Sequence, residues 1–212
     1  MSIEAVVAGS LEPFRNVTLC SLLELTPQCD VVLLPTAAVF SGMAQAALTG
    51  AQVLEASGAH VEALMIGDRA AANEAHFATR IAVAQWVVLL DGSALHARST
   101  WRNTAVGDAL STAKIIAIGE TATVIGDEMI DPRGGAPTTG LGLRSGAVFS
   151  TETSDEQLAR TKDLLARTGQ LVVLSSNGVV FRDNDQWFQW SEGGVAASFA
   201  DESVVLPRFN SR

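Results

Sequence analysis

The chain has 212 residues, a length that suits one large domain. Hydrophobic residues make up 48% of it and charged residues 17%, a composition that supports a sizeable core and argues against disorder. The net charge is −9 and no Lys/Arg cluster is present, which argues against nucleic acids and anionic membranes as partners, because both need a positively charged contact surface. A small molecule, a peptide or another protein remains as the expected partner.

The N-terminal segment and the short apolar runs predict a cytoplasmic protein. The opening residues, MSIEAVVAG, carry an acid where a secretory signal would carry basic residues. The longest apolar stretches, such as the one around Val83–Leu90, are too short to cross a bilayer. Cys20 and Cys29 are expected to be reduced, as is usual for cysteines in a cytoplasmic chain. The sequence shows no metal-ligand spacing, and we predict no metal or cofactor.

Strands and helices are predicted to alternate over the first 118 residues. The predicted strands are apolar runs: Ala5–Ala8, Val31–Pro35, Val61–Ile66, Trp86–Leu90 and Ile115–Ile118. The longer alanine-rich stretches predict helices: Ser41–Ser57, Asp68–Ala84 and Ser93–Ala113. This alternation is typical of parallel strands joined by right-handed helical crossovers. We therefore expect an α/β fold in three layers, with a mainly parallel central sheet flanked by helices.

The C-terminal third predicts one more helix, followed by short strands. Ser154 and Gln157 form a capping box that begins the helix, and Gly169 ends it. The strands are expected at Leu171–Leu174, Val179–Arg182, Trp187–Trp190 and Val195–Phe199, with a hairpin turn at Asp183-Asn184-Asp185. No linker or internal repeat interrupts the sequence. Residues 1–212 are therefore predicted to form a single domain, in which the terminal strands extend or flank the same sheet.

The segment Ile115–Leu143 has the outline of a nucleophile elbow, with a hydrophobic strand, a sharp turn, the start of a short helix and a glycine-rich loop. In an elbow, a hydroxyl or thiol side chain projects from the turn into a cleft where backbone amides can hold an oxyanion. Thr121 takes the projecting position in this interpretation. An elbow residue usually has a positive φ, which is a strained conformation for a β-branched side chain.

This segment resembles the cyanophycinase and dipeptidase E family of serine peptidases, whose fold is similar to that of class I glutamine amidotransferases. The family's elbow reads G-x-S-A-G, where this chain has GETAT from Gly119 onward. In bacterial relatives the elbow is followed by a segment much like DEMIDPRGG, residues 127–135 here. Upstream, DGSAL from Asp91 onward is similar to the family's glycine-pair loop, which supplies oxyanion contacts, and only Gly92 of that pair is present. The resemblance implies a substrate pocket lined by Gly92, Ser93, His96 and Ala122.

The catalytic positions that the resemblance implies are all altered. Thr121 stands in place of the nucleophilic serine, the expected histidine falls near Ser150, and the expected acid falls near Asn177. A hydroxyl has a high pKa and needs an adjacent base to become a nucleophile, so Thr121 is expected to be nearly inert. Thr123 and Asp91 replace small glycines, and Asp91 would place a carboxylate near the developing oxyanion.

Two hypotheses follow from these substitutions. The favoured one is a catalytically inactive member of the family, retained as a binding or assembly protein, as a homo-oligomer or as the partner of an active relative. The rival is a hydrolase of short peptides or amino-acid amides, in which Thr121 is the nucleophile and His96 or a carboxylate is the base. His96 is otherwise interpreted as a packing or surface residue. Glutamine amidotransferase chemistry is disfavoured because the elbow lacks a cysteine.

Overall fold

The computed structural model describes residues 3–132, 136–151, 170–190 and 197–199, together with residues 156, 159, 161 and 163. Those four isolated residues are helical, whereas most of the helix predicted after Ser154 lies outside the described residues. Among the residues that are described, no helix is long and apolar enough to span a membrane. Cys20 and Cys29 are both buried as free thiols, and burial raises the pKa of each.

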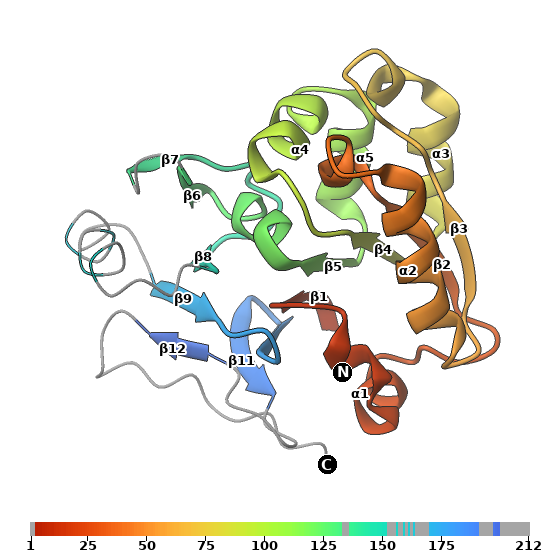
Figure 1. Ribbon diagram of the computed structural model, residues 1–212, viewed down its shortest axis with the longest axis horizontal. Helices are drawn as coiled ribbons and strands as arrows, with labels where there is room; N and C mark the ends of the chain where they lie inside the picture. The colour runs from red at the N-terminus through yellow and green to blue at the C-terminus, as the bar shows by residue number, and fades with distance from the viewer. Residues whose placement is uncertain are drawn as a thin grey trace.

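A seven-stranded sheet forms the centre of the molecule, in the order β11-β10-β1-β5-β4-β2-β3 (Figure 1). Five of its strands run parallel: β1 (Ile3–Ala8), β2 (Asp30–Leu34), β3 (His60–Ala63), β4 (Trp86–Leu89) and β5 (Ile115–Ile118). An antiparallel hairpin of β10 (Val179–Asp183) and β11 (Gln186–Trp190) extends the sheet beyond β1. Its turn contains Asn184 and Asp185 at positive φ, as the predicted turn requires.

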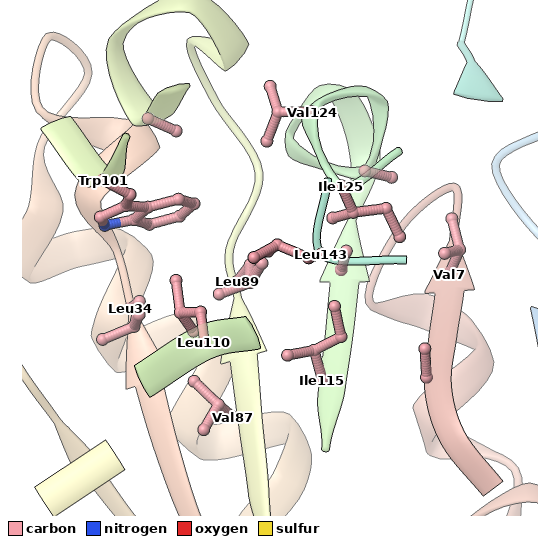
Figure 2. Close-up of a cluster of buried hydrophobic side chains, with 14 of the residues drawn as sticks. Val7, Leu34, Val87, Leu89, Trp101, Leu110, Ile115, Val124, Ile125 and Leu143 are labelled. Carbon is pink, nitrogen blue, oxygen red and sulfur yellow. The ribbon is translucent and has the colours of Figure 1, made fainter. Parts of the chain in front are cut away.

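Helices pack on both faces of this sheet, which confirms the predicted α/β architecture. Helices α1 (Val17–Leu22) and α2 (Met43–Glu55) contribute buried side chains to one core. The other core receives α3 (Ala75–Val83), α4 (Ala94–Trp101) and α5 (Ala105–Thr112). Figure 2 shows this second core, in which Trp101 and Leu110 face the apolar side chains of the parallel strands.

Two of the predicted helices differ in detail from the structure, and one observed helix was not predicted. The stretch predicted as one helix from Ser93 to Ala113 is divided into α4 and α5, because Asn103 is left-handed (φ 53°) and the Thr104 side chain accepts the Gly107 N–H to begin α5. The stretch predicted from Asp68 contains a short 3-10 turn before α3. Helix α1, capped by the Asn16 side chain, was not predicted.

Among the described terminal strands, β10 and β11 extend the central sheet and the others do not join it. Strands β8 (Ala147–Ser150), β9 (Gln170–Leu174) and β12 (Ala197–Phe199) form a separate sheet in the order β12-β9-β8. The predicted glycine-rich loop also contains a small hairpin of β6 (Glu128–Ile130) and β7 (Pro137–Thr139). This second layer of strands lies against the elbow segment, since β6 and β8 both contact residues 119–124.

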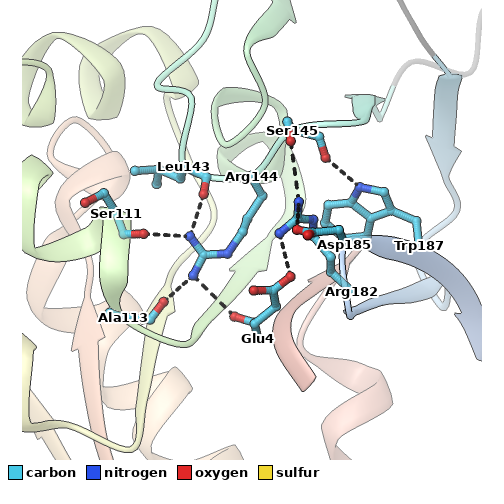
Figure 3. A network of polar contacts seen from close by, with 9 residues as sticks. All are labelled: Glu4, Ser111, Ala113, Leu143, Arg144, Ser145, Arg182, Asp185 and Trp187. Atoms are coloured by element: carbon cyan, nitrogen blue, oxygen red, sulfur yellow. Dashed lines mark hydrogen bonds and ion pairs between the residues drawn. The ribbon is translucent and has the colours of Figure 1, made fainter. Parts of the chain in front are cut away.

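A buried arginine joins the segment before β8 to the central sheet (Figure 3). The Arg144 guanidinium, on a residue only 6% exposed, donates hydrogen bonds to the carbonyls of Ser111 (3.0 Å), Leu143, Ala113 and Glu4. Beside it, Arg182 pairs with the carboxylates of Glu4 (2.5 Å) and Asp185 (2.8 Å). Burial lowers the pKa of Arg144, but arginine still stays charged at neutral pH. Its four carbonyl partners belong to β1, the end of α5 and the segment before β8.

We predict that Arg144→Met destabilises the protein by about 2–4 kcal/mol, because it leaves buried carbonyl groups without a donor. The matched control is Arg15→Met, because Arg15 is exposed and pairs only with Glu12 in its own turn. This substitution should lower the free energy of unfolding by less than about 0.5 kcal/mol. Urea denaturation of the three proteins measures both values. Equal costs for the two substitutions would contradict a structural role for Arg144.

Candidate functional site

The carboxyl ends of three neighbouring strands meet at one edge of the sheet. Ala8 at the end of β1 pairs with Ile118 at the end of β5, and Leu89 at the end of β4 pairs with Ala117. Ligand sites of parallel α/β sheets lie outside this edge. The loops that leave β4 and β5 here are the two segments that the sequence singled out.

The chain turns sharply as it leaves β5. Gly119 has φ +59° and begins a 3-10 helix, η4 (Gly119–Val124). The predicted order of strand, turn and short helix is therefore present, and Thr121 lies just after the end of β5. The positive φ, however, belongs to Gly119 and not to Thr121. The turn thus places its left-handed residue where glycine adopts it at little cost, and Thr121 is not strained.

Thr121 does not project into a cleft. Its side chain is fully buried, and its hydroxyl donates a 2.8 Å hydrogen bond to the Leu90 carbonyl. This bond ties η4 to the end of β4. Ala122, expected in the pocket lining, is also fully buried and packs in the core. Both residues therefore hold the turn in place and are not presented to a ligand.

The Asp91 carboxylate occupies the space in front of the turn. Its Oδ1 accepts hydrogen bonds from the Gly92 N–H and from the Glu120 N–H, both at 2.8 Å. A Cβ atom added to Gly119 would lie 2.2 Å from Oδ1 and from Cγ of Asp91. The carboxylate therefore fills the position that a side chain at the left-handed residue would need.

The two amides that bind Asp91 come from the loop after β4 and from the turn after β5. In a nucleophile elbow, one donor is the N–H of the residue after the nucleophile and the other comes from a separate loop. Counted from Gly119, these are the N–H groups of Glu120 and of Gly92. An anion from this chain already occupies both. The expectation that Asp91 places a carboxylate near these contacts agrees with this geometry.

The glycine of the loop after β4 is required by its packing. Gly92 has φ +146°, and a Cβ there would lie 2.4 Å from the Ala37 carbonyl oxygen. Ser93 donates its N–H to the same carbonyl, and its hydroxyl caps α4 by accepting the His96 N–H at 3.3 Å. These two predicted pocket residues thus shape the loop, and only the Gly92 N–H faces the turn.

His96 is a packing residue in this structure. Its Nε2 lies 2.9 Å from the Gly67 carbonyl oxygen and 3.3 Å from the Thr100 hydroxyl, and its ring packs edge-on against Phe40. Because a carbonyl can only accept, Nε2 must carry the proton. The imidazole is directed toward the segment after β3, which removes His96 as the base of the rival hypothesis.

Ser150 and Asn177 both lie at the edge where β5 ends. Ser150 is buried at the end of β8, the strand that contacts η4. Asn177 is exposed in the turn between β9 and β10, and this turn is held beside β1 by the bond from the Ser10 hydroxyl to the Ser176 carbonyl (2.7 Å). The two positions therefore lie at the same edge of the sheet as the turn, and neither residue is a histidine or an acid.

The edge also holds a shallow cleft and a second carboxylate. The cleft has a volume of about 260 Å3, and Gln45, Thr49 and Asp91 supply polar groups to its lining. Glu120, exposed at the rim, has its pKa raised, mainly by partial burial and further by the negative charge of Asp91. Among the described residues, no group of three or more His, Cys, Asp or Glu side chains could hold a metal ion.

Comparisons with known proteins place the fold. No protein-family model matches the chain, and no curated protein sequence matches it. The structure is similar to that of a peptidase from an acI-B1 actinobacterium, with a TM-score of 0.74, 15% identity and 92% of each chain covered. It is also similar to a protein of Listeria monocytogenes EGD-e assigned provisionally to peptidase E, with a TM-score of 0.64, 14% identity, and 89% of this chain and 98% of that chain covered. At these identities the comparisons show a peptidase E-like fold.

We predict that Asp91 and Gly119 are energetically coupled. Gly119→Ala should lower the free energy of unfolding by about 2–4 kcal/mol. The new methyl group forces the carboxylate from its two amides, and alanine is strained at this φ. In an Asp91→Ala background the same substitution should cost at least about 1 kcal/mol less. Denaturation of the four proteins gives the coupling energy.

Gly42 provides the control for this cycle. It also has a positive φ (+112°), but a Cβ there meets only the Gln45 Cβ, at 4.0 Å. Gly42→Ala should therefore carry backbone strain alone and be insensitive to Asp91→Ala. Additive costs for Gly119→Ala and Asp91→Ala would show that the carboxylate does not occupy the turn.

We also predict a pH-dependent gain in stability from Glu120→Gln. Because the pKa of Glu120 is raised on folding, its stabilising contribution is present below the unfolded pKa of about 4.3 and is lost as the pH rises through the folded value. The variant should therefore be more stable than the native protein at pH 7, and the difference should vanish near pH 4. Glu24→Gln, at the opposite edge, is the control. A gain that persists at pH 4 would contradict this assignment.

Proposed function

We propose that this chain is a catalytically inactive relative of the cyanophycinase and dipeptidase E peptidases, retained as a binding or assembly protein. The observation that carries the proposal is the Asp91 carboxylate, held by the N–H groups of Gly92 and Glu120 in front of Gly119. The peptidase E-like fold supplies the context, because it is the fold in which this edge would hold an active site.

Acyl transfer by a serine peptidase needs a nucleophile, a base and donors for the oxyanion. At this edge the left-handed turn residue is a glycine, so no side chain projects from it. The positions expected for the base and its acid carry Ser150 and Asn177. The two amides hold a carboxylate, whose negative charge would repel a developing oxyanion. The turn residue therefore offers no nucleophile, the expected base is replaced, and the two amide donors are already occupied.

The burial of Thr121 speaks against the rival function, a hydrolase that uses Thr121. To attack a substrate, the hydroxyl would have to break its bond to the Leu90 carbonyl and leave a fully buried position. It would also need a base, and the histidine proposed for that role, His96, is bonded to Gly67 instead. This leaves binding at the carboxyl edge, of a peptide, a small molecule or another protein chain, as the role that the geometry supports best.

The test is a hydrolysis assay of the purified protein. We expect no cleavage of aspartyl dipeptides, cyanophycin-like polymers or activated esters at neutral pH above the rate in buffer. Thr121→Val, which keeps the side-chain shape and removes the hydroxyl, should give the same background, and a peptidase E with its serine intact should cleave in parallel. Turnover that copurifies with the native protein and is lost in Thr121→Val would overturn the proposal.

A further inference from the structure

A second and larger cleft lies beside the corner between α4 and α5. It has a volume of about 460 Å3 and opens between the corner of α4 and α5 on one side and the segment from Thr139 to Leu143 on the other. This volume falls within the usual range for small-molecule sites. Leu141 and Leu143 provide an apolar part of its lining, and the Leu143 side chain continues into the core shown in Figure 2.

Arginine side chains hold the two walls of this cleft together. Arg98 of α4 donates to the Thr139 carbonyl, and the buried Arg144 donates to the Ser111 carbonyl of α5 at 3.0 Å (Figure 3). A third arginine, Arg69, fixes the corner by donating to the carbonyls of Arg102 (2.6 Å) and Asn103 (3.0 Å). The cleft is therefore formed before any ligand arrives, which lowers the entropic cost of binding.

The opposite wall, from Thr139 to Leu143, is held by backbone hydrogen bonds. Gly140 donates its N–H to the Asp127 carbonyl at 2.8 Å, and Gly142 donates to the Gly126 carbonyl at 2.9 Å. A Cβ on Gly140 would lie 2.0 Å from the Gly126 carbonyl oxygen, so this close pairing requires glycine. The Asp127 side chain leans over Gly142, with its Oδ1 3.5 Å from the position of a Cβ there.

Three charged side chains line the cleft: Arg102, Asp108 and Asp127. All three are exposed, and none forms a side-chain hydrogen bond or an ion pair with another residue in the part of the chain that the structure describes. The neighbouring arginines Arg69 and Arg98, in contrast, are bonded to carbonyls. The cleft thus presents two carboxylates and one guanidinium to a ligand.

We propose that this cleft binds a free basic amino acid, a ligand with two cationic groups and one carboxylate. The carboxylate would meet the Arg102 guanidinium, whose planar fork matches it with two parallel hydrogen bonds. The two cationic groups would meet Asp108 and Asp127, and the aliphatic stem would lie over Leu141. Such a ligand neutralises the net charge of −1 carried by these three side chains. The proposal concerns binding alone and is independent of the role assigned to Asp91.

The experiment uses L-lysine as the probe and follows the backbone amides of Gly107, Gly140 and Gly142 by NMR at low salt. Nε-acetyl-lysine lacks one cationic group and cadaverine lacks the carboxylate, so each should bind about tenfold more weakly than lysine. Asp127→Asn should weaken the binding of both lysine and cadaverine. Arg102→Gln should weaken lysine about tenfold and leave cadaverine unchanged, because cadaverine has no carboxylate to lose.

Glu24→Gln and Arg15→Gln, which change charges of each sign outside the cleft, should bind lysine as the native protein does. The absence of lysine-dependent shifts up to about 10 mM, which corresponds to a binding free energy weaker than about 3 kcal/mol, would overturn the proposal. Shifts that are the same in Arg102→Gln and Asp127→Asn as in the native protein would also overturn it. Hydrolytic activity at the carboxyl edge would overturn the proposed function and leave this inference standing.

Discussion

The structure of the carboxyl edge depends on the two hydrogen bonds that the Asp91 carboxylate accepts. It receives one amide from its own loop and one from η4, so it joins the chain segments that leave β4 and β5. The bond from the Thr121 hydroxyl to the Leu90 carbonyl joins the same two segments a few atoms away. Together these contacts set the turn at Gly119, the orientation of Glu120 and one wall of the small cleft beside β4.

Most of the central sheet could be predicted because parallel strands buried on both faces appear as continuous apolar runs. Four of the five parallel strands were found in this way, and the fifth, β3, was also predicted but is a largely exposed edge strand. The break between α4 and α5 was missed, although Asn103-Thr104 combines a residue that tolerates a left-handed backbone with a good helix cap. The β6 and β7 strands have three residues each, too few for an alternating pattern to stand out.

The sequence directed attention to Thr121, whereas the left-handed residue of the turn is Gly119. Thr121 drew attention because it carries a hydroxyl in a frame similar to G-x-S-A-G, and the frame does not reveal where the backbone turns. The informative residue was Gly119, the glycine that directly follows the apolar strand and can take a positive φ freely. The contact between Asp91 and Glu120 links loops 29 positions apart, and it depends on the order of β4 and β5 in the sheet.

The fit between Asp91 and Gly119 also bears on whether single substitutions could introduce a nucleophile at this turn. A serine introduced at Gly119 would collide with the carboxylate, and removal of the carboxylate alone would leave the turn without its cross-link. Each first step therefore lowers stability before the second can bring any benefit, and a base would still be missing. Whichever of the two substitutions came first, the chain would pass through a destabilised intermediate.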